Sequence, residues 1–136
     1  MVASVSDGSV FVGSQSPNRQ ARVMRLSDET MTWFNGTTEF ESSTLGTATS
    51  GWNTYVWRKQ ATTIDLYQNG VNVLSGSDSS TAFFIGQIGG VFNTMDADFS
   101  DIIAYNASLS ASEINGNLSA LQSRYSSQVP AQTAIA

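Results

Sequence analysis

The stretch TTIDLYQNGVNVLS, at residues 62–75, decides the fold class of this chain. It places an Asn69-Gly70 pair between two runs in which apolar and polar side chains alternate. Asn-Gly pairs accept the positive φ values that both central residues of a type I′ turn require, and the twist of that turn matches paired antiparallel strands. The stretch therefore predicts a β-hairpin, with one strand at residues 62–68 and the other at residues 71–74.

Further strands are predicted on both sides of this hairpin. Asn35-Gly36 stands between short runs at 31–34 and 37–41, so the same turn chemistry predicts a second hairpin. Between the hairpins, GWNTYVWRKQ at 51–60 carries large side chains on both faces, which is typical of a central strand. Shorter apolar runs predict strands at 9–15, 20–27, 82–85 and 99–105. Short strands at this close spacing indicate an all-β fold, an antiparallel β-sandwich of jelly-roll type.

One amphipathic helix is predicted after the last strand, over residues 111–124. Ser110 and Glu113 have the spacing of a capping box, in which each side chain hydrogen-bonds the other residue's backbone N–H. Leu109 and Ile114 are spaced for the hydrophobic staple that accompanies such a box. Four apolar side chains recur at helical spacing and define the face that lies on the sheet: Ile114, Leu118, Leu121 and Tyr125.

Length and composition bound the domain organisation and the chemistry. The 136 residues are expected to form one domain over 1–125, followed by a tail at 126–136 that runs over the surface or onto a neighbouring molecule. The chain contains no Cys and no His, which excludes disulfides, thiolate metal sites and histidine-based catalysis. The net charge is −5 and the 6 Lys and Arg residues are scattered, so no nucleic-acid partner is expected.

The amino-terminal residues bear on localisation. They lack the basic start and the apolar run of about 7–15 residues that a signal peptide needs, and no segment reaches about 18 apolar residues. Synthesis in the cytosol without membrane insertion is therefore expected. A chain cut from a longer precursor would have the same amino terminus, so an extracellular location stays open.

The carboxyl-terminal half resembles the laminin-G-like branch of the concanavalin A-like lectin and glucanase superfamily. The resemblance lies in a Trp that opens a strand, an Asn-Gly hairpin, a short Ile-Gly strand, and a final strand that leads into a helix. It extends over roughly residues 51–125, at these positions: Trp52, Tyr67, Asn69, Gly70, Ile85, Gly86, Phe99, Ile102, Ile103, Tyr105, Asn106, Leu109, Ser110, Glu113 and Ile114. The resemblance implies a β-sandwich. The family has further strands at its amino-terminal end, and this chain is too short to contain them all. The edge left by those strands would be covered by another subunit.

The resemblance implies a pattern of catalytic carboxylates that can be looked for in this sequence, because the superfamily includes glycosidases. They carry their catalytic carboxylates on one strand in the pattern Glu-x-Asp-x-x-Glu, whose first two acids are two positions apart and so lie on one face. No stretch of this sequence has that spacing, so no enzymatic activity and no required cofactor are expected. The nearest acidic group, Asp96, Asp98 and Asp101, is expected to be a solvated loop. Because laminin-G-like domains often carry Ca²⁺ on their rim, a calcium site at Asp96 and Asp98 is the alternative.

A sugar-binding site needs an exposed aromatic face beside amide groups. By residue type, the ligand-binding candidates are Trp33, Asn35 and Trp57. Trp33 is expected to be exposed because it stands beside the predicted Asn35-Gly36 turn. For each of these aromatic side chains, the alternative is a place in the interior of the sandwich.

Composition and resemblance together favour a non-catalytic, lectin-like module of a virus particle, such as a bacteriophage capsid decoration or tail-fibre protein. Charged residues make up only 12% of the chain, and its polar residues are mainly Ser, Thr, Asn and Gln. Such a module would be located in the virion and would act by self-association or by docking to a coat or tail protein, with glycan attachment as an additional role. The alternative is a carbohydrate-binding domain of a secreted or surface bacterial protein. A glycosidase is a third hypothesis, kept because the superfamily contains such enzymes.

Overall fold

The computed structural model describes residues 10–15, 18–25, 30–35, 37–41, 52–79, 87–88 and 101–136. This part of the chain is a small β-rich fold with one helix, as the sequence predicts. The elements are β1 (Val10–Gln15), β2 (Asn18–Arg25), β3 (Thr30–Phe34), β4 (Glu39–Glu41), β5 (Tyr55–Gln60), β6 (Thr63–Gln68), β7 (Val71–Ser77), β8 (Gln87–Ile88) and α1 (Ala111–Arg124).

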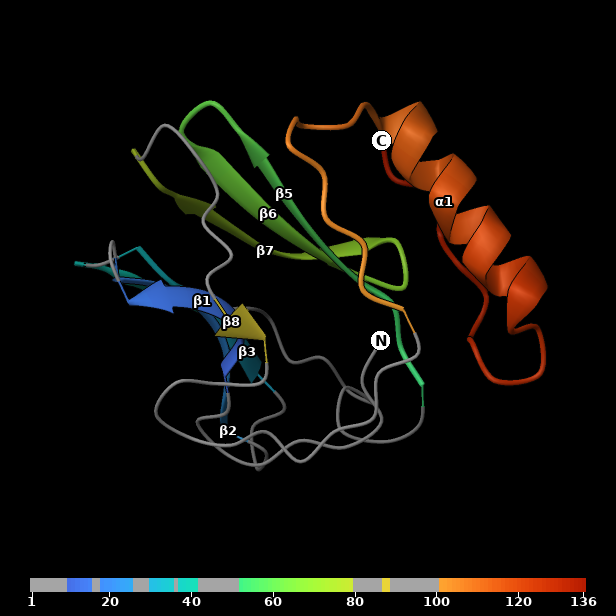
Figure 1. Cartoon of the computed structure of the whole chain (residues 1–136), viewed down its shortest axis with the longest axis horizontal. Coiled ribbons are helices and arrows are strands. Elements are labelled where there is room, and N and C mark those ends of the chain that lie inside the picture. The colour runs from blue at the N-terminus through green and yellow to red at the C-terminus, as the bar shows by residue number, and fades with distance from the viewer. Residues whose placement is uncertain are drawn as a thin grey trace.

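The strands form two antiparallel sheets. Five strands pair in the order β4-β3-β2-β1-β8, and three strands pair in the order β5-β6-β7. In Figure 1 the three-stranded sheet lies between the five-stranded sheet and α1. The central strand β6 is therefore covered on both faces, which explains why residues 64–68 are all buried.

The predicted hairpin at Asn69-Gly70 is confirmed as the connection between β6 and β7. Asn69 has a φ of 50° and Gly70 a φ of 84°, the left-handed values of a type I′ turn. A Cβ added to Gly70 would lie 1.6 Å from the backbone oxygen of Thr133. Glycine is thus required here both by the turn and by the close approach of the carboxyl-terminal chain.

The second predicted hairpin is confirmed as β3 and β4, but its connection is longer than two residues. Phe34 pairs with Glu39, so four positions of the chain, and not two, separate the paired residues. The Asn35 side-chain oxygen accepts hydrogen bonds from the backbone N–H groups of residues 37 and 38, at 3.0 and 2.8 Å. Asn35 Nδ2 donates to the backbone oxygen of Ser77 at 2.9 Å, which joins this loop to the end of β7. Asn35 therefore directs the turn through its own side chain.

The two sheets are in contact through large side chains. Trp33 of β3 packs against Trp57 of β5, with ring centroids 5.8 Å apart and ring planes tilted by 45°. Gly76 of β7 lies against Phe40 of β4, where an added Cβ would be 2.7 Å from the ring carbon Cγ. The absence of a side chain at Gly76 thus makes room for Phe40 between the sheets.

The other face of the three-stranded sheet packs against α1. The buried cluster there contains Tyr67 of β6, Ile114 and Leu118 of α1, and Ile135 of the tail. Leu109 packs against this cluster, which contains its predicted staple partner Ile114. The predicted helix bounds and the capping box are both confirmed. In the described part of the chain, no helix has the length and apolar character that crossing a membrane requires.

The tail folds back onto the domain instead of extending away from it. Thr133 N donates to Asn69 O at 2.8 Å, which fastens the tail to the β6–β7 turn. The Asn115 side chain donates to Ile135 O at 3.0 Å and accepts from Ile135 N at 2.8 Å. Val129 and Ile135 are buried, so the tail contributes apolar surface to the core.

The strand pattern departs from the prediction at several points. β5 is an edge strand of its sheet and not a central one, because β6 is joined by tight hairpins to both of its neighbours. Within the predicted strand at 99–105, the described residues 101–105 form no strand. β8, which pairs with β1, was not predicted because it is only 2 residues long. The strand predicted at 82–85 lies outside the described residues.

The capping box predicts a pH dependence of helix stability. Glu113 accepts hydrogen bonds from Ser110 Oγ at 2.7 Å and from Ser110 N at 2.8 Å, and these bonds hold the pKa of Glu113 below its ordinary value. A carboxyl group whose pKa is lowered on folding stabilises the folded state above its unfolded pKa of about 4.3. That contribution is lost as the pH falls below about 4.3 and through the folded pKa.

We expect the melting temperature of the wild type to fall more steeply between about pH 5 and 3 than that of Glu113→Gln. Glutamine keeps the acceptor oxygen but does not titrate. The measurement is thermal unfolding followed by far-ultraviolet circular dichroism, which reports secondary structure. Identical pH profiles for the two proteins would contradict this role of Glu113.

Candidate functional site

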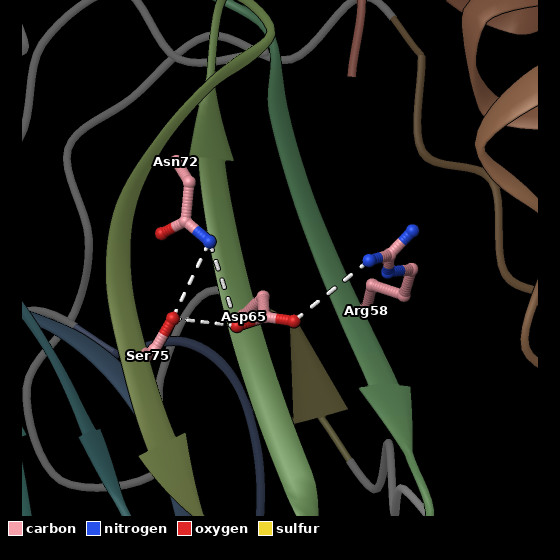
Figure 2. Close-up of polar contacts among 4 residues, drawn as sticks. All are labelled: Arg58, Asp65, Asn72 and Ser75. Carbon is pink, nitrogen blue, oxygen red and sulfur yellow. Dashed lines mark hydrogen bonds and ion pairs between the residues drawn. The ribbon is translucent and has the colours of Figure 1, made fainter. Parts of the chain in front are cut away.

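A row of polar side chains crosses the three strands of the β5-β6-β7 sheet (Figure 2). Arg58, Asp65 and Ser75 are cross-strand neighbours on β5, β6 and β7, and Asn72 extends toward them from the start of β7. The side chains of Arg58, Asp65 and Ser75 share one face because residues directly opposite in antiparallel strands point the same way. Together with Asn72, these three residues are called the Asp65 row below.

Asp65 is the acceptor at the centre of this row. Its Oδ1 accepts from Ser75 Oγ at 2.6 Å and from Asn72 Nδ2 at 3.5 Å. Arg58 Nη2 stands 4.0 Å from Asp65 Oδ2, and both side chains are 12% exposed. The Arg58 guanidinium also lies 5.4 Å from the centroid of the Tyr67 ring, within range of a cation–π interaction. Asp65 thus has partners from both neighbouring strands.

The chemistry of the Asp65 row is that of a structural network with limited capacity for a ligand. It contains a single carboxylate, whereas glycoside hydrolysis uses two carboxylates about 5–9.5 Å apart. Arg58 Nε is buried and has no hydrogen-bond partner. Because that N–H is buried, the groups of the row that a ligand could reach are the side chains of Asn72 and Ser75, both of which belong to exposed residues.

A second polar cluster ties the residues before β5 to the β6–β7 turn. Asn69 Oδ1 accepts from Thr54 N at 3.0 Å, and Asn69 Nδ2 donates to Asn53 Oδ1 at 2.9 Å. Gln68 Nε2 donates to the same Asn53 oxygen at 3.3 Å, and Thr54 Oγ1 bonds the side chain of Gln132 in the tail. Asn53 is only 1% exposed, so this cluster holds the turn and the tail in place and faces the interior.

Tyr55, the first residue of β5, carries a titratable hydroxyl in the interior. Burial raises the pKa of this hydroxyl far above its ordinary value, and a hydrogen bond with Gln68 opposes the shift. The hydroxyl therefore stays protonated throughout the neutral pH range. It serves as a hydrogen-bonding group and is not available as a general base.

Of the three predicted ligand residues, Trp33 and Trp57 meet at the contact between the sheets, whereas Asn35 joins the β3–β4 loop to the end of β7. Trp33 is 1% exposed, so the prediction of an exposed indole is wrong. Its side chain is buried because β3 turns it toward β5, where it meets the half-buried Trp57. Asn35 uses its side chain for the turn and for Ser77. Ligand binding by these residues stays a prediction, without an open Trp33 face to support it.

The predicted calcium ligands Asp96 and Asp98 lie outside the described residues. Asp101, the third acid of that group, is described, and its Oδ1 is 3.4 Å from Arg124 Nη1 of α1. Asp101 Oδ2 is buried and accepts no hydrogen bond. Over the described ranges, no group of 3 or more acidic, His or Cys side chains is placed to hold a metal ion.

An exposed apolar surface at residues 101–105 was not predicted from the sequence. It is called the apolar strip below. It exposes 47% of Ile102, 56% of Ile103 and 51% of Tyr105. Among the residues that the structure describes, the backbone of residues 102–105 has no hydrogen-bond partner. One signal could have revealed it: two adjacent isoleucines cannot both point inward from a strand, so at least one is exposed.

The ends of the apolar strip are held by side chains of α1. Arg124 contacts Asp101, and Asn117 Nδ2 donates to the Tyr105 hydroxyl at 2.9 Å. In Figure 1 the strip is part of the irregular orange stretch that leads into α1. Its position is thus set by the helix, while its apolar side chains and backbone groups stay open.

Comparisons with family models, with curated proteins and with solved structures found no match to this chain. Two features of the described surface can therefore be interpreted from their own geometry. The Asp65 row is largely satisfied by internal contacts, and the apolar strip is open.

Proposed function

We propose that this chain is a non-catalytic, lectin-like structural module of a virus particle, a bacteriophage capsid decoration or tail-fibre component that acts through protein–protein assembly. The observation that carries the proposal is the apolar strip. Exposed apolar surface next to unpaired backbone groups is the kind of surface that a partner covers. In this proposal the chain is located in the virion and docks to a coat or tail protein.

The use of the polar side chains supports an assembly role over a chemical one. Asp65 is bonded to Ser75 and Asn72, and Glu113 is bonded to the helix start at Ser110. The chain also has no His or Cys to serve as a general base or a nucleophile. These acids thus stabilise strands and caps.

The proposal includes a finer description of the fold. We infer that the two sheets form a single sandwich of jelly-roll type, with α1 covering its outer face. The contact of Trp33 with Trp57 and the fit of Phe40 against Gly76 support this description, because both lie between the sheets. A sandwich leaves edge strands that a neighbouring subunit would cover, which agrees with assembly.

The proposal predicts that the chain is a component of purified particles. We expect quantitative mass spectrometry of particles produced by the host of this gene to find the chain in a fixed ratio to the coat or tail protein. Bulk cytosolic proteins of similar abundance serve as the control for contamination. Recovery of the chain only in the soluble fraction, or its retention on a glycan column after secretion, would overturn the virion role and favour the carbohydrate-binding alternative.

A further inference from the structure

The tail at residues 126–136 lies on the rest of the chain as a bound peptide would. It forms neither a helix nor a strand. Val129 and Ile135 are buried and Gln132 is half-buried, whereas the residues between them are exposed. A repeat of three residues is that of a polyproline II helix, a conformation in which many peptides are recognised. In Figure 1 the tail, in red, turns back after α1 and runs beside it.

The β6–β7 turn and α1, called the tail-binding surface below, recognise the backbone of the tail. Asn115 Nδ2 donates to Ile135 O at 3.0 Å, and Asn115 Oδ1 accepts from Ile135 N at 2.8 Å. One amide side chain thus satisfies both backbone groups of a single tail residue. Thr133 N donates to Asn69 O at 2.8 Å, and the missing side chain of Gly70 leaves room for Thr133 O. These contacts require an extended chain close to the surface.

The same surface also recognises two side chains of the tail. Ile135 enters the apolar cluster that contains Tyr67, Ile114 and Leu118. Three positions earlier, the Gln132 side chain bonds Thr54 Oγ1. The surface therefore fits a peptide with an apolar residue and, three positions before it, a side chain that forms hydrogen bonds.

The turn that joins α1 to the tail is short and exposed. Residues 126–128 are exposed, and the N–H groups of Gln128 and Val129 both donate to Tyr125 O at 2.9 Å. Opening this turn breaks those bonds but leaves the tail able to bind an identical surface on another copy. The tail contains no Asp, Glu, Lys or Arg, whereas the whole chain has a net charge of −5. A tail therefore meets little charge repulsion when it approaches a second copy.

We propose that the tail-binding surface is a peptide-recognition site, and that in an assembly it binds the tail of a second copy in place of the chain's own tail. The two arrangements share the contacts of residues 129–135 with the surface and differ in the turn at 125–128. Exchange of an identical segment between copies is a low-cost route to association. The inference rests on the assembly role proposed above and names a contact through which copies join.

Two full-length variants test this exchange when they are mixed. Ile135→Asp puts a carboxylate into the apolar cluster, so that chain has an intact surface but a defective tail. Asn115→Ala removes both bonds to the Ile135 backbone, so that chain has an intact tail but a defective surface. Alanine is a better helix former than asparagine, so α1 is kept.

We expect each variant to be monomeric alone and the equimolar mixture to form a dimer with one copy of each. The measurement is size-exclusion chromatography with light scattering at concentrations up to about 1 mM. Circular dichroism checks that both variants fold. Should Ile135→Asp fail to fold, Ile135→Ala takes its place, because it shortens the same buried side chain without adding a charge and carries the same prediction.

Two matched controls locate the contact. A mixture of Asn115→Ala with the double variant Asn115→Ala/Ile135→Asp offers an intact tail but no intact surface, so it should stay monomeric. Ala134→Asp adds the same charge at the exposed neighbouring position, so its own tail should stay bound and it should not dimerise with Asn115→Ala. A dimer in the first control would mean that the copies join elsewhere, and would overturn the assignment to the tail-binding surface.

A labelled peptide of residues 126–136 tests recognition without a second copy. In the wild type the tethered tail competes with the peptide at a millimolar effective concentration. Fluorescence anisotropy should therefore show the peptide binding at least about tenfold more tightly to Ile135→Asp than to the wild type. Equal binding to the two proteins would contradict a peptide-recognition site at this surface.

Other outcomes separate this inference from the virion role. A mixture of Ile135→Asp and Asn115→Ala that stays monomeric at every concentration would overturn the exchange. If the chain were then still found in particles at a fixed ratio, the virion role would stand without it. A mixed dimer formed by a chain that is absent from particles would support the exchange and contradict the virion role.

Discussion

Replacing Gly70 by alanine is expected to lower the free energy of unfolding by more than about 2 kcal/mol. The φ of 84° at this position costs an L-residue roughly 1–2 kcal/mol. The added Cβ would also lie 1.6 Å from Thr133 O, so the tail must move away. That movement breaks the bond between Thr133 N and Asn69 O. Urea denaturation followed by tryptophan fluorescence measures the loss.

Gly116→Ala is the matched control for this substitution. Gly116 lies in α1, and a Cβ placed there meets nothing within 4 Å. Alanine is favoured over glycine inside a helix by about 1 kcal/mol, so this variant should be more stable than the wild type. The two glycine replacements should therefore change stability in opposite directions. A Gly70→Ala variant as stable as the wild type would contradict the close contact between turn and tail.

Replacing Trp33 by alanine should destabilise the fold by about 3–5 kcal/mol. Trp33 is 1% exposed, and its ring fills the space against Trp57 between the two sheets. The cavity left by the indole would remove contacts from both sheets together. Thermal unfolding of the variant, monitored in the near ultraviolet, should show a much lower midpoint than the wild type.

Trp33→Phe gives this prediction its control, because the smaller ring fills part of the same space and should cost less. The same pair of variants separates packing from ligand contact. If Trp33 bound a sugar ring on an exposed face of its indole, the Trp33→Ala variant would lose glycan binding but would be as stable as the wild type. A loss of less than about 1 kcal/mol would mean that Trp33 is not part of a tightly packed interior.

The features that could be predicted from the sequence are those decided by neighbouring residues. The φ values at Asn69 and Gly70 follow from the chemistry of the pair itself. The bounds of α1 follow from the box between Ser110 and Glu113 and from the apolar spacing that comes after it. In both cases the deciding contacts span a few positions of the chain, so the local pattern carries the information.

The features that could not be predicted depend on residues far apart in the chain. Alternation allowed Trp33 to lie on either face of its strand, and the side facing Trp57 is decided by how the two sheets meet. The strip at 101–105 has the composition of a strand, but strand formation requires a partner edge as well. Its contacts with Asn117 and Arg124 come from the following helix. The Asp65 row likewise depends on the register of three strands.

The packing of Trp33 on Trp57 also gives the chain a built-in optical reporter. Two indoles with centroids 5.8 Å apart and planes tilted by 45° couple their electronic transitions. Such coupling produces a pair of circular dichroism bands of opposite sign that depends on the relative orientation of the rings. Because one indole belongs to each sheet, this signal would follow the docking of the sheets separately from the formation of their strands.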